Sequence, residues 1–233
     1  IPIEGTLERY TTVITQMDYF RTLGNTLIYT IALTLIQVLI CSMVGYGFAR
    51  FDFPLKKLLF GCVVLMIVIP NHTIMLPQYM TFRSMGLMSE ATPMYILTLF
   101  GTGLRAGLFI YIFNQFIRGL PRELDESAYL DGCSDLKVFV KILVPLMKPA
   151  LFSAGLFQFM WTYNDYTNVL IYINSVKKYT LSLALRLSLD AESVVQWNKV
   201  MAMSFLSILP LIILFFAAQK YFVEGIATSG LKG

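Results

Sequence analysis

Five long apolar segments dominate this chain and constrain its fold more than any other feature. Each reaches the roughly 20 residues that a helix needs to cross a lipid bilayer. Because a bilayer interior holds no water to satisfy backbone N–H and C=O groups, each segment is expected to be helical. The sequence therefore predicts an all-α, polytopic membrane helical bundle with spans at residues 22–49, 58–82, 91–117, 149–176 and 200–219.

The composition agrees with a membrane protein. Of 233 residues, 57% are hydrophobic and only 14% are charged, which is too apolar for an ordinary soluble domain. This apolar composition predicts that the chain is surrounded by membrane lipid. The net charge of +4 is small and dispersed, so we expect no nucleic-acid partner. The single histidine and three cysteines lack metal-ligand spacing, so no metal site is expected.

Residues 1–21 lack the basic start and apolar middle of a signal peptide. Within them, Leu7, Tyr10, Ile14 and Met17 recur at helical spacing, which predicts a short amphipathic helix along the membrane surface. We therefore divide the chain into an extracytoplasmic surface segment, 1–21, and a transmembrane domain, 22–233. Because the chain starts at Ile1 rather than methionine, we expect further residues upstream. These residues could contain a sixth membrane-spanning helix.

Lysine and arginine near helix ends indicate orientation, because they are retained on the cytosolic side. They are dense in the short segment 50–57 and around 118–148, and two more, Lys220 and Lys232, lie in the tail. This bias places the 118–148 segment and the C-terminus in the cytosol. Residues 173–199 then lie outside.

The cytosolic segment begins with a short charged helix. Glu123, Asp125 and Glu126 would lie near its N-terminus, where the helix dipole favours anions. Leu124 and Ala128, at four-residue spacing, give it one apolar face.

Gly132 is suited to end this helix, because glycine readily adopts the left-handed backbone conformation of a helix C-terminus. Ser134 can then cap a second helix, which we expect Pro145 to stop. The pattern predicts a helix–glycine–helix elbow on one side of the membrane.

The spacing of this elbow resembles the EAA loop of bacterial ABC importer permeases. The family pattern is E-A-A, three residues, G, nine residues and then I-x-L-P. Here it is matched by Glu126-Ser127-Ala128, Gly132, Ile142 and Pro145. Ser127 replaces the first alanine, and Val144 replaces the leucine before the proline.

The resemblance extends along nearly the whole chain to the second permease subunit of maltose-type carbohydrate importers. Supporting stretches are residues 46–51, 69–70, 161–165 and 230–233. It implies an ABC importer type I permease fold and a multi-pass location in the bacterial inner membrane. It further implies heterodimerisation with a homologous permease subunit, an ABC ATPase dimer that binds ATP and Mg, an extracytoplasmic solute-binding protein and a carbohydrate substrate. By the same resemblance, coupling to the ATPase would depend on Glu123, Glu126, Ser127, Ala128, Gly132 and Pro145.

Several polar side chains lie inside the apolar spans. In the first, Thr26, Thr30, Thr34 and Gln37 form a stripe that either lines a transport path or hydrogen-bonds neighbouring helices. In the second, Asn71 and His72 lie between Pro70 and Pro77. These prolines indicate either a hinge that lines a cavity or a helix that ends near Ile69, with the rest at the outer surface.

Arg105 in the third span and Asp165 in the fourth are costly in lipid, so each should face protein or a water-filled cavity. They either form a buried ion pair or face a translocation path; Asp165 alternatively sits at the outer interface. Together with Asn164 they suit hydrogen bonds to sugar hydroxyls, and Trp161 suits stacking on a sugar face. Arg105 would also favour an anionic saccharide.

Two further patterns concern packing. Gly45 and Gly47 in the first span, and Gly103 and Gly107 in the third, suit close helix approach. In the external segment 173–199, leucines at alternate positions predict a strand-like or irregular loop: Leu181, Leu183, Leu185, Leu187 and Leu189. The resemblance implies that this loop meets the solute-binding protein; the alternative is packing on its own helices.

The chain has no Gly-x-x-x-x-Gly-Lys-Ser/Thr loop for nucleotide phosphates and no nucleophile–base pair. We therefore expect a transport subunit rather than an enzyme, with no cofactor of its own and with ATP hydrolysis carried by another chain. The alternatives are the same importer fold with a non-sugar substrate, and a secondary carrier or membrane enzyme. A carrier should show internal repeats, and we see none.

Overall fold

The computed structural model describes residues 8–88, 90–190 and 197–230, and all regular structure within these ranges is helical, as expected. The elements are α1 (Glu8–Gln16), α2 (Tyr19–Arg50), α3 (Lys56–Val68), α4 (Asn71–Ser84), α5 (Thr92–Leu99), α6 (Ala106–Arg118), α7 (Glu123–Leu130), α8 (Asp135–Val138), the π-helix η1 (Phe139–Leu143), α9 (Val144–Leu146), α10 (Lys148–Tyr163), α11 (Thr167–Tyr172), the 3₁₀-helix η2 (Val176–Lys178), α12 (Leu181–Asp190) and α13 (Trp197–Gly230).

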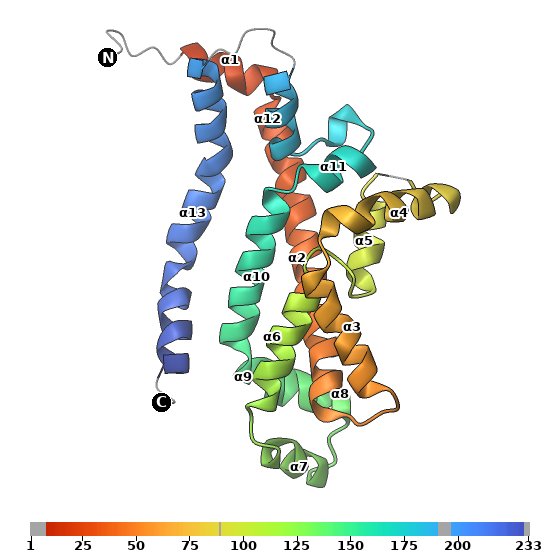
Figure 1. Ribbon diagram of the computed structural model, residues 1–233. Helices are drawn as coiled ribbons and strands as arrows, with labels where there is room; N and C mark the ends of the chain where they lie inside the picture. Colours follow the sequence, from red (N-terminus) through yellow and green to blue (C-terminus); the bar gives the residue numbers. More distant parts are fainter. Residues whose placement is uncertain (1–7, 89, 191–196, 231–233) are drawn as a thin grey trace.

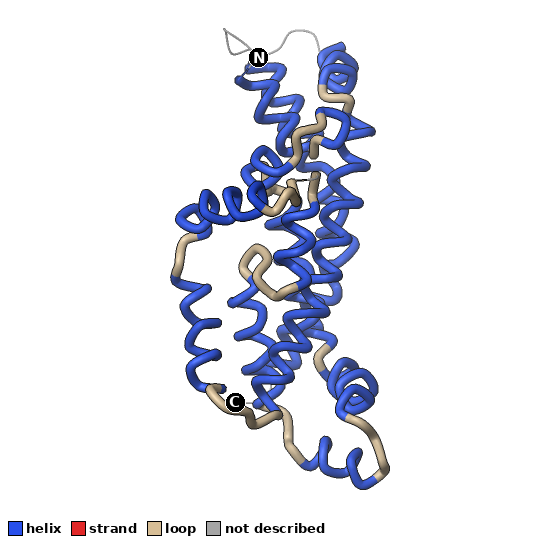
Figure 2. Tube along the Cα trace, turned by 90° about the vertical axis from the view of Figure 1, so that its right-hand side faces the viewer, coloured by secondary structure: helices blue, strands red, loops and turns tan. Residues whose placement is uncertain are grey.

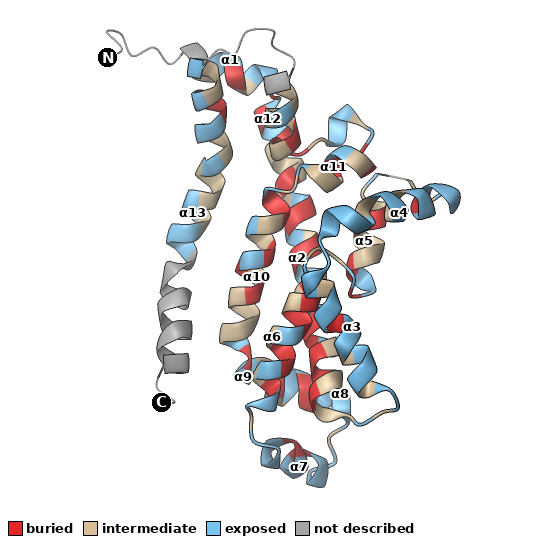
Figure 3. Cartoon of the chain, in the orientation of Figure 1, coloured by how far each residue is buried: buried red, intermediate tan, exposed pale blue. Residues whose placement is uncertain are grey.

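The long helix α2 is the axis of the bundle, and α6 and α10 pack along it (Figure 1). The buried residues gather where these helices meet, as Figure 3 shows. Phe109, Phe113 and Ile117 of α6 are almost fully buried there, together with Cys41 of α2. By contrast, most of α4 and much of the described part of α13 are exposed, which suits surfaces that face lipid or a partner.

Glycines decide how closely α6 approaches its neighbours. A Cβ at Gly45 would lie 2.8 Å from Phe113 Cβ, and a Cβ at Gly107 would lie 2.7 Å from the Val63 carbonyl oxygen. Close approach was expected at both. The expectation was wrong for Gly47, around which no atom lies within 4 Å. Gly103 is also closely surrounded, by Thr98 and Gln37, but it lies in the loop before α6 rather than inside a helix.

The second predicted span is bent. Helix α3 ends at Val68, Ile69 is extended, and α4 continues from Asn71 at 106° to α3. Pro70 causes this, because it lacks a backbone N–H and disfavours a helical conformation for the residue before it. Helix α3 therefore ends near Ile69, and Figure 2 shows the loop at which α4 leaves the direction of α3, so the helix end and the bend of the two alternatives are both observed.

The third and fourth predicted spans are also interrupted. Between α5 and α6, Gly101 and Arg105 have φ angles of 69° and 57°. Arg105 was expected near the middle of a spanning helix, but it is the N-cap of α6. Residues 164–166 separate α10 from α11, so Asp165 also lies in a break.

By length and composition, two helices in the described part of the chain can cross a membrane, Tyr19–Arg50 and Trp197–Ala217. The number rises to four if each bent pair counts as one span: α3 with α4, and Asp135–Leu146 with α10. Five uninterrupted spans are therefore not observed, because prolines and left-handed residues break the apolar segments.

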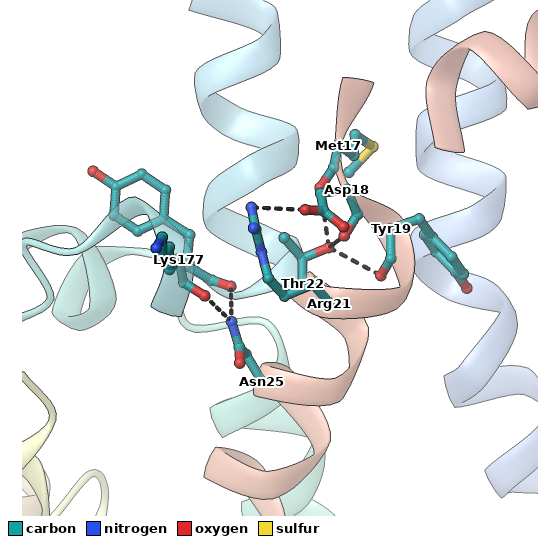
Figure 4. A network of polar contacts seen from close by, with 8 residues as sticks. Met17, Asp18, Tyr19, Arg21, Thr22, Asn25 and Lys177 are labelled. Atoms are coloured by element: carbon teal, nitrogen blue, oxygen red, sulfur yellow. Dashed lines mark hydrogen bonds and ion pairs between the residues drawn. The ribbon is translucent and has the colours of Figure 1, made fainter. Parts of the chain in front are cut away.

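Residues 173–199 contain a helix, α12, so the expectation of a strand-like or irregular loop was wrong there. The backbone N–H of Leu181, the first residue of α12, donates to Thr26 Oγ1 at 2.8 Å. Figure 4 shows the adjoining contact, in which Asn25 Nδ2 of α2 donates to the Lys177 carbonyl at 2.8 Å. Leu181 and Leu183 are both fully buried, so their alternation reflects a helix enclosed by neighbours and not a strand. Residues 191–196 of this segment lie outside the described residues.

The expected N-terminal helix is present as α1, and it lies across one end of the bundle (Figure 1). Val13 of α1 is fully buried and Met17 nearly so. Asp18, with a φ angle of 44°, separates α1 from α2, which starts at Tyr19 rather than near residue 22. Residues 1–7 and 231–233 of the predicted surface segment and tail lie outside the described residues.

The glycine contacts predict opposite results for two neighbouring substitutions. Gly45→Ala should destabilise the protein by about 1–3 kcal/mol, because the new methyl group overpacks the α2–α6 contact. Gly47→Ala, two residues away in the same helix, should leave stability unchanged or raise it by about 0.5–1 kcal/mol. Thermal unfolding in one detergent compares the two variants, and equal melting temperatures would contradict this account of the packing.

Candidate functional site: a terminal elbow and a polar cavity

The predicted elbow protrudes from one end of the bundle (Figure 1). Helix α7 ends as expected at Gly132, whose φ angle is 77°. The Gly132 N–H donates to the Tyr129 carbonyl at 3.0 Å, and the Cys133 N–H donates to the Ala128 carbonyl at 2.9 Å. This is the Schellman pattern of hydrogen bonds, which satisfies the carbonyls at a helix C-terminus.

The anchor of the elbow is a buried ion pair that the sequence patterns did not predict. Arg50 Nε, at the end of α2, lies 2.5 Å from Asp125 Oδ2 in α7, and both side chains are less than a tenth exposed. Arg50 Nη2 also donates to the carbonyl of Leu120 at 3.1 Å. Burial raises the pKa of the Asp125 carboxyl above its ordinary value, against the opposing effect of the Arg50 and Arg122 charges.

The remaining faces of α7 point away from the bundle. Glu123, Glu126 and Ser127 are exposed, and Ser127 Oγ donates to the Glu123 carbonyl at 2.7 Å. Ala128 is 5% exposed and belongs to the inner face, as expected. Leu124, which was expected beside it, is partly exposed because Asp125 takes the inner position.

The second arm of the elbow starts at Ser134, the N-cap of α8, although its side chain makes no capping hydrogen bond. The helix that Pro145 was expected to stop ends one residue beyond it, at Leu146. A π-helical turn, η1, precedes the proline, and α9 continues through it to Leu146 before an 81° bend into α10. Because α9 follows η1 without a break, Pro145 lies in the last turn of the continuous stretch Asp135–Leu146, where its missing N–H leaves one helical hydrogen bond unmade beside the bend.

A polar cavity of about 210 Å³ opens among the breaks of the second, third and fourth predicted spans. Arg105 and Asp165 both line it. No ion pair within 4.0 Å joins Arg105 to Asp165 or to another described carboxylate. Asp165 instead accepts hydrogen bonds from the backbone N–H and the side-chain amide of Asn168, at 3.1 and 2.6 Å. Of the alternatives for these two residues, the shared cavity is observed.

The other candidates for a substrate path lie outside this lining. Trp161 lies beneath Arg105, whose Cζ is 4.3 Å from the indole centroid. Asn164 is exposed, and its side-chain amide donates to the Met160 carbonyl at 2.8 Å. Thr34 and Gln37 are buried in the bundle, and Gln37 Nε2 contacts Cys41 Sγ at 3.4 Å. None of these four residues lines the cavity.

The cavity includes polar residues that the sequence patterns did not single out, Gln158 and Thr162 of α10. Both are buried, and Gln158 Nε2 donates to Thr162 Oγ1 at 3.0 Å, whereas Gln158 Oε1 has no partner. Their four-residue spacing within an apolar segment was the signal that could have revealed them. Asn71 and His72, at the start of α4, complete the polar lining. The described residues contain no cluster of three or more side chains placed to hold a metal ion.

Comparisons with known proteins agree with one another. Residues 41–228 match a family described as "Binding-protein-dependent transport system inner membrane component". The chain is 33% identical over 235 residues to the "Alpha-glucoside transport system permease protein AglG" of Rhizobium meliloti (strain 1021), with 100% of this chain covered and 62% of that protein. It is 29% identical over 233 residues to the "Arabinooligosaccharides transport system permease protein AraQ" of Halalkalibacterium halodurans, covering 100% of this chain and 81% of that one.

A solved structure shares the fold. It is described as the "Crystal structure of a bacterial ABC transporter involved in the import of the acidic polysaccharide alginate". The TM-score is 0.79 and the sequence identity 20%, over 95% of this chain and 81% of that chain. The all-α membrane helical bundle expected from the sequence is therefore shown for the fold.

The buried ion pair predicts a specific pattern of stability. Asp125→Ala should destabilise the docked elbow by about 3–5 kcal/mol, because it leaves the Arg50 charge buried and unpaired. The double variant Arg50→Met/Asp125→Leu should recover most of this loss, because no uncompensated charge remains. Limited proteolysis measures how firmly the elbow packs against the bundle, because a detached 118–148 segment would be cleaved faster.

The control is Lys56→Met, which breaks an exposed ion pair with Asp52 and should change little. An Asp125→Ala variant as resistant to protease as the wild type would show that the ion pair does not anchor the elbow.

Proposed function

This chain belongs to the family of binding-protein-dependent transport system inner membrane components, and from this premise we propose that it is the permease subunit of an ATP-driven importer of a carbohydrate. It would form half of the translocation path. ATP and Mg would be bound by separate ATPase subunits, and the transported sugar would be delivered by an extracytoplasmic solute-binding protein.

The observation that carries this proposal is the exposed outer face of an anchored elbow. Glu123 and Glu126 of α7 are exposed, and so are apolar side chains of the elbow: Leu130 of α7 is 90% exposed and Leu136 of α8 is 61% exposed within the described part of the chain. Mixed carboxylates and uncovered leucines on a short rigid helix suit a docking surface for another protein. The Arg50–Asp125 pair gives that surface a firm connection to α2.

This geometry suits a lever. An ATPase dimer that changes shape on binding ATP would displace α7, and the ion pair and α2 would carry the displacement into the bundle as a rigid-body movement. Glu123, Glu126, Ser127, Ala128 and Gly132 are the proposed coupling residues of α7, and Pro145 lies in the second arm. For the elbow to reach an ATPase, it would lie in the cytosol, and we propose the same side for the C-terminus.

The polar cavity suits a carbohydrate. Arg105, Asp165 and His72 offer charged or ionisable groups, and Gln158 and Thr162 add an amide and a hydroxyl. Such groups form paired hydrogen bonds with sugar hydroxyls. The names of the two relatives above refer to alpha-glucosides and arabinooligosaccharides, which supports a sugar as the substrate class. Because the cavity is open and small for an oligosaccharide, we propose that a homologous permease subunit provides the other wall in a heterodimer.

A pair of glycines tests the lever. Gly132 in the elbow and Gly86 at the end of α4 have φ angles of 77° and 69°, and at either glycine an added Cβ would have no atom within 4 Å. Valine should cost each site a similar amount, about 1–2 kcal/mol of backbone strain. We expect Gly132→Val to lower ATP-dependent uptake of labelled maltose or arabinobiose into proteoliposomes at least tenfold. Gly86→Val should retain most of it.

The reconstituted particle holds this chain, its partner permease, the ATPase subunits and the solute-binding protein. Equal uptake by the two valine variants, with both complexes intact on size exclusion, would count against coupling through the elbow. Uptake of neither sugar by the wild type would count against these substrates.

The charge of the cavity predicts its selectivity. Arg105→Gln keeps a hydrogen-bond donor at the cavity wall but removes the positive charge, so uptake of a uronate-containing oligosaccharide should fall more than uptake of a neutral one. Arg83→Gln, an exposed position of α4, is the matched control. Equal losses for both sugars would remove the argument from charge.

A further inference from the structure

A separate cavity of about 320 Å³ lies where α2 and α6 end, beside the starts of α3 and α7. Its lining is strongly basic, with one carboxylate and four cationic side chains: Asp52, Lys56, Lys57, Arg118 and Arg122. This cavity plays no part in the proposed transport path, because it lies at the elbow end of the bundle.

Three of the four cations form no ion pair within 4.0 Å with a described carboxylate, although the Arg122 charge acts at longer range on the carboxyls of Asp52 and Asp125. Lys56 is accounted for, since its ammonium lies 3.0 Å from Asp52 Oδ1 and donates to the Phe51 carbonyl at 2.7 Å. Lys57, Arg118 and Arg122 have no ion pair within 4.0 Å to a described carboxylate. Like charges that converge on one cavity repel one another, so an anion bound among them would be favoured.

A buried amide adds a second polar feature. Asn114 of α6 is 1% exposed and lines the same cavity. Its side-chain nitrogen donates to the Gly45 carbonyl at 3.4 Å, whereas its Oδ1 has no hydrogen-bond donor. A buried acceptor without a donor is costly, so a ligand that brings a hydroxyl group as well as a negative charge fits this lining better than a bare anion.

The wall of the cavity becomes apolar toward the bundle. Phe48 and Phe60 both line it, and their rings pack edge to face at 5.4 Å. Along α3 above them, Leu58, Leu59 and Leu65 are 62%, 45% and 56% exposed. A cationic cavity that continues into an exposed apolar helix face matches a phospholipid, whose charged headgroup adjoins its acyl chains.

We propose that this cavity binds the headgroup of an anionic glycerophospholipid with free hydroxyls, of which phosphatidylglycerol is the simplest. The phosphate is held by Lys57, Arg118 and Arg122, a headgroup hydroxyl donates to Asn114 Oδ1, and the acyl chains follow α3. The binding needs only that this end of α2 and α6 lies at the bilayer surface. It is therefore independent of the substrate and of the ATPase, and it ties the lipid to the base of the elbow.

The test uses the purified complex of this chain with its partner subunits in neutral detergent. Native mass spectrometry measures the fraction that carries added phosphatidylglycerol as its concentration is raised. Lys57→Gln and Arg118→Gln should each weaken binding about fivefold, the equivalent of about 1 kcal/mol for one cation at a bilayer surface. Arg83→Gln, an exposed arginine on α4, should not change it.

Two further variants separate recognition from folding. Arg118→Lys keeps the charge and should retain binding, which excludes misfolding as the cause of the loss in Arg118→Gln. Asn114→Leu should reduce the preference for phosphatidylglycerol over phosphatidic acid, whose headgroup has no glycerol hydroxyls.

Three results would overturn the proposal. The first is equal binding by the wild type and the glutamine variants, or equal binding of phosphatidylcholine. The second is full competition by the same concentration of inorganic phosphate, which would indicate a free-anion site. The third is binding that is absent in the full complex and appears only after the ATPase subunits are removed, which would make an acidic segment of that partner the occupant. Because the readout is lipid and not uptake, failure here is distinct from failure of the proposed function.

Discussion

The ion pair between Arg50 and Asp125 joins the elbow to the rest of the bundle. It links the last residue of α2 to the inner face of α7, and both charges are almost fully withdrawn from solvent. Two buried charges hold their geometry tightly, because neither can leave the other without a large desolvation cost. The elbow therefore moves with α2 or breaks a costly contact.

Helix α2 carries this connection to the opposite end of the molecule. Its 32 residues run from the elbow to the far end of the bundle, where Asn25 donates to the Tyr179 carbonyl and Thr26 accepts from the Leu181 N–H. Gly45 lets α6 pack close along it, so the two helices form a stiff pair. A displacement at one end of such a pair reaches the other with little loss, which suits a subunit driven from one side of a membrane and loaded from the other.

The breaks in the apolar segments create the polar cavity. Pro70, Arg105 and Asp165 each mark an interruption, and the structure brings the three interruptions to one place. Non-helical backbone is tolerated at membrane depth only where protein or water satisfies it. The irregular backbone and the polar side chains therefore occur together, because unpaired backbone groups need polar partners or water. The Trp161 ring beneath Arg105 helps to hold a charged side chain there without a carboxylate partner.

Local sequence was sufficient for the features that depend on near neighbours. The apolar runs required helices, Gly132 required a left-handed end to α7, and the spacing from Glu126 to Pro145 was specific enough to indicate the family. It was not sufficient where a distant partner competes with local preference. The alternating leucines after Thr180 became α12 because Thr26, 155 residues away, accepts a hydrogen bond at its first turn.

The sequence did not predict that Asp125 is buried, because an acidic residue in the first turn of a helix is normally exposed to solvent. Only the fold places Arg50 against it, 75 residues earlier in the chain. The sequence by itself determined that the long apolar segments are helical and where the elbow turns, because hydrophobicity and backbone preference act over a few residues. The tertiary structure decided which charges are buried together and which breaks share a cavity, because those energies depend on groups that only folding brings into contact.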